Sequence, residues 1–222
     1  MNPNTALAGL RIYSGYFDRD AQRELHAAIR AVLAAAPLFT PRMPKSGRPF
    51  SVRMSNCGLL GWTSDERGYR YQPTHPATGR VWPPIPKQLI ALWGEVARYA
   101  DPPEACLINF YDRTAKMGLH QDRDEADFEA PVVSISLGDD CLFRVGGGHR
   151  RDPTKSIRLS SGDVLVLGGD SRLAFHGVDR IYPGTSSLLA DGGRINLTLR
   201  RVTRRLAKQS SAQTEAKAPH HA

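Results

Sequence analysis

"RINLTLRRV", residues 194–202, alternates polar and apolar side chains through its first seven positions. The polar positions are Arg194, Asn196, Thr198 and Arg200, and the apolar positions are Ile195, Leu197 and Leu199. Because side chains two residues apart lie on the same face of a β-strand, this segment predicts a strand with one polar and one apolar face. We expect the apolar face to pack against helices and the polar face to point into a barrel, where two arginines require anions. The alternative is an edge strand whose arginines are solvated.

The chain between residues 103 and 203 consists of short predicted strands separated by clusters of glycine and aspartate. These strands are 105–111, 118–122, 132–137, 141–145, 156–160, 163–167 and 194–202. They follow one another without a helical pattern between them, which favours a sandwich or jelly roll over a sheet built from βαβ units. We interpret "GGGHRRD" (146–152) as a hairpin turn, because it lacks the lysine and the following helix of a phosphate-binding loop.

Two helices are predicted ahead of the strands. Asp18 is the expected cap of a helix over 19–36, in which apolar residues recur at helical spacing. A second helix is predicted over 86–100, with Trp93 on its buried stripe. The segment between the two helices carries turn signals and aromatic residues, so we interpret it as an irregular, β-rich flap rather than a separate domain.

The composition is that of a soluble globular protein with one domain. A length of 222 residues, a hydrophobic fraction of 41% and a charged fraction of 23% allow one well-buried core. The sequence shows neither a membrane-spanning apolar run nor the pattern of a signal peptide, so we expect a cytoplasmic protein that does not associate with membranes. The formal net charge of +8 indicates a polyanionic partner. We expect Cys57, Cys106 and Cys141 to be reduced core residues and 206–222 to be a disordered tail.

A metal site is predicted around "GLHQDRDE", residues 118–125. His120 and Asp122 stand two positions apart in a predicted strand, so both side chains can reach one ion, and His176 is the best candidate for a third ligand. Two histidines and one carboxylate form a facial triad, which is typical of non-haem Fe(II) oxygenases. The same residue types also suit zinc hydrolases, and an HxD pair often occurs by chance. The two arginines of segment 194–200 favour an oxygenase, since they could grip a small dicarboxylate such as 2-oxoglutarate.

A series of motifs resembles, in order, the AlkB family of Fe(II)/2-oxoglutarate-dependent dioxygenases, which oxidatively dealkylate nucleic-acid bases. The motifs are "CLINFY" (106–111), "LHQDRDE" (119–125), "APVVSISLG" (130–138), "RRDP" (150–153), "GDVLVLGGDSRLAFHGV" (162–178) and "RINLTLRR" (194–201). Upstream, "MSNCGLLGWTSDERGYRYQP" (54–73) resembles the nucleotide-recognition lid of the family's bacterial repair enzyme. The similarity covers about residues 45–203. One departure is Leu167, where that enzyme has a tryptophan.

The resemblance implies roles for three groups of residues. The implied iron ligands are His120, Asp122 and His176. The implied contacts to 2-oxoglutarate are Asn109, Tyr111, Arg194, Asn196 and Arg200. The implied substrate contacts are Trp62, Tyr69, Asp124, Glu125 and Arg150.

The resemblance also implies the fold and the reaction. The expected fold is mostly β with flanking helices: a double-stranded β-helix, or jelly roll, with an N-terminal helix and a nucleotide-recognition lid. We expect a single dioxygenase domain over 1–205, with the lid at about 40–85 and the jelly-roll core at about 103–203. With Fe(II), 2-oxoglutarate and O2, it would demethylate N-alkylated bases such as 1-methyladenine and 3-methylcytosine. The expected partner is single-stranded or base-flipped DNA, or RNA, and the expected state is a monomer.

Two alternatives remain open at the level of sequence. One is an RNA or protein demethylase of the same family, and the other is a nucleic-acid-binding jelly roll that no longer holds iron. The acidic residues beside His120 bear on substrate choice. Bases methylated on a ring nitrogen are cationic, so a carboxylate from Asp124 near the iron would attract them. For Glu125, the alternative is a turn in which the acid faces water.

Overall fold

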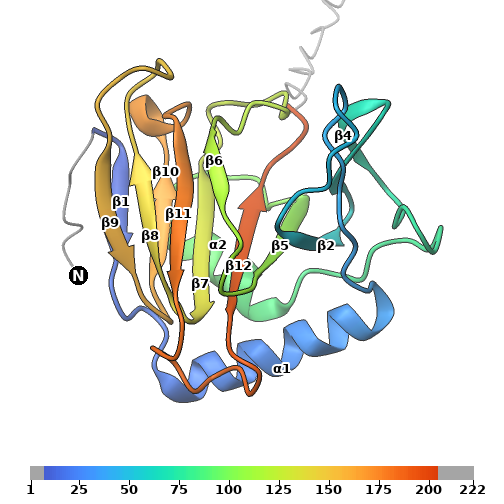
Figure 1. The fold of residues 1–222 in the computed structure, drawn as a ribbon, viewed down its shortest axis with the longest axis horizontal. Helices are drawn as coiled ribbons and strands as arrows, with labels where there is room; N and C mark the ends of the chain where they lie inside the picture. Colours follow the sequence, from blue (N-terminus) through green and yellow to red (C-terminus); the bar gives the residue numbers. More distant parts are fainter. Residues whose placement is uncertain (1–7, 205–222) are drawn as a thin grey trace, which may run out of the picture.

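The computed structural model describes residues 8–204 and contains two antiparallel β-sheets packed face to face, as expected for a jelly roll (Figure 1). The larger sheet has the strand order β1 (Leu10–Tyr13), β10 (Val164–Leu167), β7 (Val132–Gly138), β12 (Arg194–Arg200), β5 (Ala105–Tyr111) and β2 (Arg53–Gly58). The smaller sheet has the order β6 (Met117–His120), β11 (His176–Tyr182), β8 (Asp140–Val145) and β9 (Lys155–Leu159). The predicted tail at 206–222 lies outside the described residues.

The two predicted helices cover the outer face of the larger sheet. Helix α1 spans Arg19–Ala35, and its first turn is capped by Asp18, whose carboxylate accepts the Ala21 N–H at 2.9 Å. Helix α2 spans Lys87–Val96 and ends earlier than predicted. The buried apolar residues of both helices, Trp93 among them, share one cluster with Ile195, Leu197 and Leu199 of β12. The predicted apolar face of this strand is therefore confirmed.

The inner face of the larger sheet, opposite the helices, points into the space between the two sheets. A second apolar cluster fills part of this space, and it includes Leu107 of β5, Val132 of β7 and Phe143 of β8. The polar face of β12 is buried in the same space, because all seven of its residues are buried. The interpretation of β12 as an edge strand is therefore wrong, since β5 and β7 pair with it on either side.

The flap is only partly separate from the jelly roll. Its first strand, β2, pairs with β5 and forms the edge of the larger sheet. The next two strands, β3 (Gly61–Asp65) and β4 (Gly68–Gln72), form a two-stranded sheet of their own, here called the β3–β4 hairpin. Figure 1 shows β4 near β2, at the edge of the larger sheet.

Strands β6 and β11 differ from the predictions in ways that bear on the site. Strand β6 ends at His120, so Asp122 lies in the following loop and not on the strand as expected. Strand β11 was not predicted at all. Its register against β8 shifts between Val178 and Arg180, and such a bulge breaks the alternation by which a strand is recognised in sequence.

Two further sequence expectations can be compared with the fold. Cys57, Cys106 and Cys141 are buried and free of disulfide bonds, as predicted. Between residues 8 and 204, neither helix has the length and apolar character needed to cross a membrane. A short 3-10 helix, η1 (Gly169–Ser171), follows β10 and leads the chain towards His176.

Candidate metal centre and co-substrate pocket

A cavity of about 440 Å³ opens between the two sheets on the polar face of β12. Its lining combines apolar side chains of the inner cluster with charged and amide groups. All three predicted iron ligands and all five predicted 2-oxoglutarate contacts line it: His120, Asp122, His176, Asn109, Tyr111, Arg194, Asn196 and Arg200. Residues that lie more than 80 positions apart in the sequence therefore meet in one chamber.

The predicted metal ligands come together at the junction of β6 and β11. His120 at the end of β6 pairs in register with His176 at the start of β11, and their ring centroids lie 4.5 Å apart. Asp122 reaches the same point from the loop after β6. One ligand atom from each of the three residues can be chosen so that all lie within 4.8 Å of one another. This spacing suits a single ion held by two imidazoles and one carboxylate.

Backbone carbonyls set the tautomer of both histidines. The Nδ1 atom of His120 lies 2.9 Å from the Gly118 carbonyl oxygen, and the Nδ1 atom of His176 lies 2.9 Å from that of Ala174. Each Nδ1–H therefore donates to a carbonyl, and each Nε2 keeps its lone pair for a metal. Burial, reinforced by the nearby His120, lowers the pKa of His176 to about 4, so the imidazole is neutral near neutral pH.

Asp122 is held as a carboxylate by its surroundings. Burial alone would raise its pKa, but Arg200 and the two histidines outweigh burial and hold the pKa below its usual range. The Arg200 Nη2 donates to Oδ1 of Asp122 at 2.8 Å, while the His176 Nε2 lies 3.6 Å from Oδ2. Oδ1 also lies 3.7 Å from the His120 Nε2, so the carboxylate faces both imidazoles through its two oxygens.

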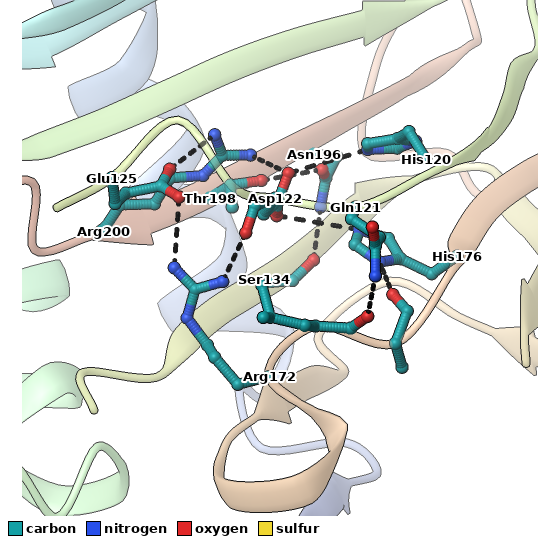
Figure 2. A network of polar contacts seen from close by, with 12 residues as sticks. His120, Gln121, Asp122, Glu125, Ser134, Arg172, His176, Asn196, Thr198 and Arg200 are labelled. Carbon is teal, nitrogen blue, oxygen red and sulfur yellow. Dashed lines mark hydrogen bonds and ion pairs between the residues drawn. The ribbon is translucent and has the colours of Figure 1, made fainter. Parts of the chain in front are cut away.

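Behind Asp122 lies a network of four charged or hydroxyl groups: Glu125, Arg172, Arg200 and Tyr71. Figure 2 shows the first three. Glu125 accepts hydrogen bonds from the Tyr71 hydroxyl at 2.5 Å, from Arg172 at 3.1 Å and from Arg200 at 3.2 Å. Arg172 also donates to the backbone oxygen of Asp122 at 2.6 Å and thereby fixes the loop after β6. Burial raises the pKa of the Tyr71 hydroxyl well above its ordinary value, so this group remains a donor.

The environment of Glu125 corrects two expectations. Its side chain is fully buried (0% exposed), so it does not face water in a turn. It is also absent from the residues that line the cavity, and both of its oxygens are engaged by protein groups. Glu125 therefore balances the charges of Arg172 and Arg200 and is not placed to contact a substrate.

Arg194, at the other end of the polar face of β12, has few partners. It is 1% exposed, and its Nη2 donates to the Ser136 hydroxyl at 2.9 Å. Its Nε and Nη1 atoms, like the Asn109 Oδ1, are buried without a hydrogen-bond partner among residues 8–204. Its guanidinium carbon lies 5.4 Å from the centre of the Tyr111 ring. A buried guanidinium with two unpaired nitrogens can bind a carboxylate, so the residues of this pocket fit 2-oxoglutarate.

Asn196 lies between the two arginines and is held by protein partners. Its amide nitrogen donates to the Ser134 hydroxyl at 2.7 Å and to the Ile135 carbonyl at 3.1 Å. Its amide oxygen accepts from the Thr198 hydroxyl at 3.1 Å. Both amide donors are therefore in use, and a ligand would meet an amide whose orientation is already fixed.

The mouth of the cavity carries four of the predicted substrate residues: Trp62, Tyr69, Asp124 and Arg150. The Trp62 indole N–H donates to the exposed Asp124 carboxylate at 2.8 Å. The Tyr69 ring stacks on the Trp62 ring with centroids 5.6 Å apart and an interplanar angle of 18°, so one face of the indole is partly covered. Arg150 lies over the Phe175 ring at 5.3 Å. These side chains form a rim with a carboxylate beside an aromatic ring.

Sequence reasoning missed several residues that shape the site. Ser134 and Ser136 of β7 alternate with apolar residues in "VVSISL" and pair in register with Thr198 and Asn196, so this alternation could have revealed them. Gln121 ties the loop after β6 to the chain near η1, since its amide nitrogen donates to the Leu173 carbonyl at 2.5 Å. Tyr71 and Arg172 gave no comparable signal, because only the fold brings them near Asp122.

Comparisons with known proteins agree with this geometry. The family model described as the 2OG-Fe(II) oxygenase superfamily matches residues 9–200, which defines the class of protein. An alpha-ketoglutarate-dependent dioxygenase AlkB homolog of Caulobacter vibrioides is 55% identical over 200 residues, or 90% of each chain. The alpha-ketoglutarate-dependent dioxygenase AlkB of Escherichia coli K12 is 43% identical over 190 residues, covering 84% of this chain and 87% of that protein. The chain belongs to the AlkB family of this superfamily.

A solved structure supports the same conclusion for the fold. The structure of OsALKBH1 superposes with a TM-score of 0.72 and 32% sequence identity, and the match covers 89% of this chain and 100% of that chain. The protein is therefore an Fe(II)- and 2-oxoglutarate-dependent dioxygenase that uses O2. The clustered ligand atoms of His120, Asp122 and His176 form a metal site compatible with this class.

Proposed function

We propose that this dioxygenase demethylates N-alkylated nucleic-acid bases, such as 1-methyladenine and 3-methylcytosine, in single-stranded DNA or RNA. The observation that carries the proposal is the rim of the cavity, where Asp124 stands beside Trp62 and both line the chamber that holds the three-ligand cluster. An exposed carboxylate next to an indole suits a flat cation, since both groups attract positive charge. Bases methylated on a ring nitrogen are such cations, whereas ordinary bases are neutral.

The names of two more distant relatives support a nucleic-acid substrate. A tRNA demethylase of Schizosaccharomyces pombe is 36% identical over 110 residues, which cover 45% of this chain and 36% of that protein. A DNA N(6)-methyladenine demethylase of Arabidopsis thaliana is 44% identical over 108 residues, which cover 44% of this chain and 24% of that protein. The formal net charge of +8 suits a polyanionic strand of either kind.

In this proposal the polar residues of the cavity divide into a metal end and a co-substrate end. His120, His176 and Asp122 would hold Fe(II), because one ligand atom from each lies within 4.8 Å of the others. Arg194 would bind one carboxylate of 2-oxoglutarate through its two free donors. Asn109 lines the same cavity and has an unpaired amide oxygen. The side chains of Asn196 and Tyr111 also line it and would contact the ligand.

The residues of the chain position the reactants and exclude water. When bound, Fe(II) with 2-oxoglutarate and O2 supplies the oxidation that turns the methyl group into a hydroxymethyl group, which leaves as formaldehyde while succinate and CO2 form. Trp62 would stack on the base through the ring area that Tyr69 leaves open, opposite the imidazole of His120. Asp124 would accept a hydrogen bond from the exocyclic amine, and Arg150 would contact the strand. A base must leave its stack to enter such a chamber, so the substrate is single-stranded or flipped.

We further propose that the protein acts as a monomer in the cytoplasm in direct reversal of DNA alkylation damage. The three free cysteines support a reducing compartment. Demethylation of RNA is the nearest alternative, because the rim recognises a base and a charge, which DNA and RNA share.

The test is a formaldehyde assay on matched oligonucleotides. Each carries one 1-methyladenine in single-stranded DNA, double-stranded DNA or RNA, and a methylated peptide serves as the control for protein demethylation. We expect 2-oxoglutarate-dependent formaldehyde release from the single-stranded nucleic acids, and none from the Asp122→Ala variant. Turnover of 2-oxoglutarate with formaldehyde from the peptide alone would favour a protein demethylase. Absence of any 2-oxoglutarate turnover would favour an inactive binding module.

A further inference from the structure

One hydroxyl group connects the β3–β4 hairpin to the metal site. Tyr71 lies on β4 and is half-buried, and its hydroxyl donates to Oε1 of Glu125 at 2.5 Å. The same hydroxyl accepts a hydrogen bond from Nη1 of Arg200 at 3.0 Å. Arg200 in turn donates through Nη2 to Oδ1 of Asp122 at 2.8 Å. The path from the hairpin to the metal ligand therefore consists of two hydrogen bonds made by Arg200, one to the Tyr71 hydroxyl and one to Asp122. Figure 2 shows the second of them.

The contacts of Arg200 show why its orientation needs support. Its side chain is 7% exposed, and two carboxylates compete for it, from Asp122 at 2.8 Å and from Glu125 at 3.2 Å. Its Nε atom has no hydrogen-bond partner within the described part of the chain. Tyr71 holds Nη1 and at the same time satisfies the Glu125 oxygen nearest to it. Loss of the hydroxyl would leave Glu125 to attract Arg200 more strongly, at the expense of the contact to Asp122.

We propose that Tyr71 is a positioning residue that links the β3–β4 hairpin to metal binding by fixing Arg200 against Asp122. The inference rests on the proposed metal-ligand role of Asp122. Two observations carry it: the bridging geometry of the hydroxyl, and the fact that the other side-chain hydrogen bond from the hairpin to the loop after β6, from Trp62 to Asp124, involves neither Arg200 nor Glu125.

The link has a thermodynamic consequence. A nucleic acid that binds Trp62 on β3 holds the hairpin in place, and Trp62 pairs in register with Tyr71 on the neighbouring strand. If the hairpin holds Arg200, a bound strand raises the affinity for metal. By linkage, metal must then raise the affinity for the strand by the same factor. Tyr71 carries this coupling, so a variant without the hydroxyl binds both ligands nearly independently.

The chain offers a matched control for removing the hydroxyl. Tyr99 is also half-buried, and its hydroxyl donates to the carboxylate of Asp127 at 2.5 Å, which is the length of the Tyr71 contact. Tyr99→Phe therefore removes a hydroxyl–carboxylate hydrogen bond of the same length without touching Arg200. Any effect of Tyr71→Phe that Tyr99→Phe does not share comes from the metal-side network and not from a general loss of stability.

The experiment measures Mn(II) binding by calorimetry in wild type, Tyr71→Phe and Tyr99→Phe, each with and without a saturating methylated single-stranded oligonucleotide. We expect Tyr71→Phe to weaken Mn(II) binding roughly 10-fold, the scale of one hydrogen bond to a charged group. We also expect the oligonucleotide to raise Mn(II) affinity in wild type and Tyr99→Phe but not in Tyr71→Phe. Thermal unfolding of the metal-free variants checks that each one is folded.

Two outcomes separate this inference from the proposed function. If wild type releases formaldehyde and Tyr71→Phe has the Mn(II) affinity and the coupling of wild type, the positioning role of Tyr71 is wrong and the proposed function stands. If Tyr71→Phe weakens Mn(II) binding but wild type releases no formaldehyde from any oligonucleotide, the positioning role stands and the proposed substrate is wrong.

Discussion

Arg194 and Arg200 lie on the same polar face of β12, yet their surroundings differ. Arg200 pairs with two carboxylates of the protein, Asp122 and Glu125. Arg194 has one hydroxyl partner, and two of its nitrogens are buried without a partner among residues 8–204. Burying an unpaired charge is costly, so a buried guanidinium with free donors indicates that its anion comes from a ligand. We therefore propose that Arg200 supports the metal ligand and that Arg194 binds the co-substrate.

The sequence treated both arginines alike: each needs an anion, and together they could grip the two ends of a small dicarboxylate. The structure supplies the anions of Arg200 from the loop after β6, through Asp122 and Glu125. Substitutions can show whether the Arg194 end and the Arg200 end of β12 act separately, and the largest effect is expected at Asp122.

Replacing Asp122 with alanine should abolish formaldehyde release and Mn(II) binding. The substitution removes one of three clustered ligands and leaves Arg200 with Glu125 as its sole carboxylate partner among the described residues. Calorimetry with Mn(II) and the formaldehyde assay measure the two effects. Asp122→Asn retains the shape without the charge and should also fail to bind metal. Turnover at the wild-type rate in either variant would remove Asp122 from the metal site.

Arg200→Lys should destabilise the protein by about 3 kcal/mol, because lysine cannot serve two buried carboxylates with the fork of a guanidinium. Arg194→Lys should change stability by less than about 1 kcal/mol in the absence of ligand, since Arg194 makes one side-chain hydrogen bond in the described chain. Urea unfolding of both metal-free variants provides the comparison. Equal losses of stability would mean that the two arginines have the same structural role.

Trp62→Ala should weaken binding of a methylated oligonucleotide by about 1–3 kcal/mol, the scale of one base–aromatic stacking contact. Mn(II) binding should remain within the range of wild type. Trp62→Phe separates stacking from the hydrogen bond to Asp124, because phenylalanine retains a ring and loses the indole N–H. Fluorescence anisotropy of a labelled strand gives the affinity. Unchanged binding in Trp62→Ala would reduce Trp62 to a packing residue of the hairpin.

Asp124→Ala should reduce activity on cationic lesions more than on neutral ones. The expected selective loss is roughly 5-fold, or about 1 kcal/mol, because Asp124 is exposed and solvent screens its charge. Formaldehyde release from matched strands with 1-methyladenine or 3-methylthymine measures the ratio. Asp124→Asn tests whether charge or hydrogen bonding is responsible. The same fractional loss on both lesions would show that Asp124 supports the rim without selecting the base.

The sequence predicts the regular part of this molecule well. The alternation in 194–200 identified the buried strand and both of its faces, because a strand between two layers must separate polar from apolar side chains. The HxD pair and a later histidine identified the ligand cluster, although the strand was expected to extend through Asp122. His120 and Asp122 meet because the chain turns after β6, where Arg172 holds the loop.

The network behind the metal site was not predictable from local patterns. Tyr71 and Glu125 lie 54 positions apart, and Glu125 and Arg200 lie 75 apart, so their contacts exist only once the sheets have formed. Strand β11 was missed for a related reason. Its bulge breaks the alternation, and Gly177 within it is required by close approach of β6, since a Cβ there would lie 2.4 Å from the Met117 oxygen.

The central claim is that Arg194 holds the co-substrate while Arg200 supports the metal ligand, and one titration tests it directly. 2-Oxoglutarate is titrated into Mn(II)-saturated wild type and Arg194→Lys, and Mn(II) binding to the same proteins is measured separately. We expect Arg194→Lys to weaken 2-oxoglutarate binding by roughly 10-fold or more, since lysine cannot reproduce a bidentate contact. Its affinity for Mn(II) should equal that of wild type. Unchanged 2-oxoglutarate affinity, or a parallel loss of Mn(II) binding, would contradict the account.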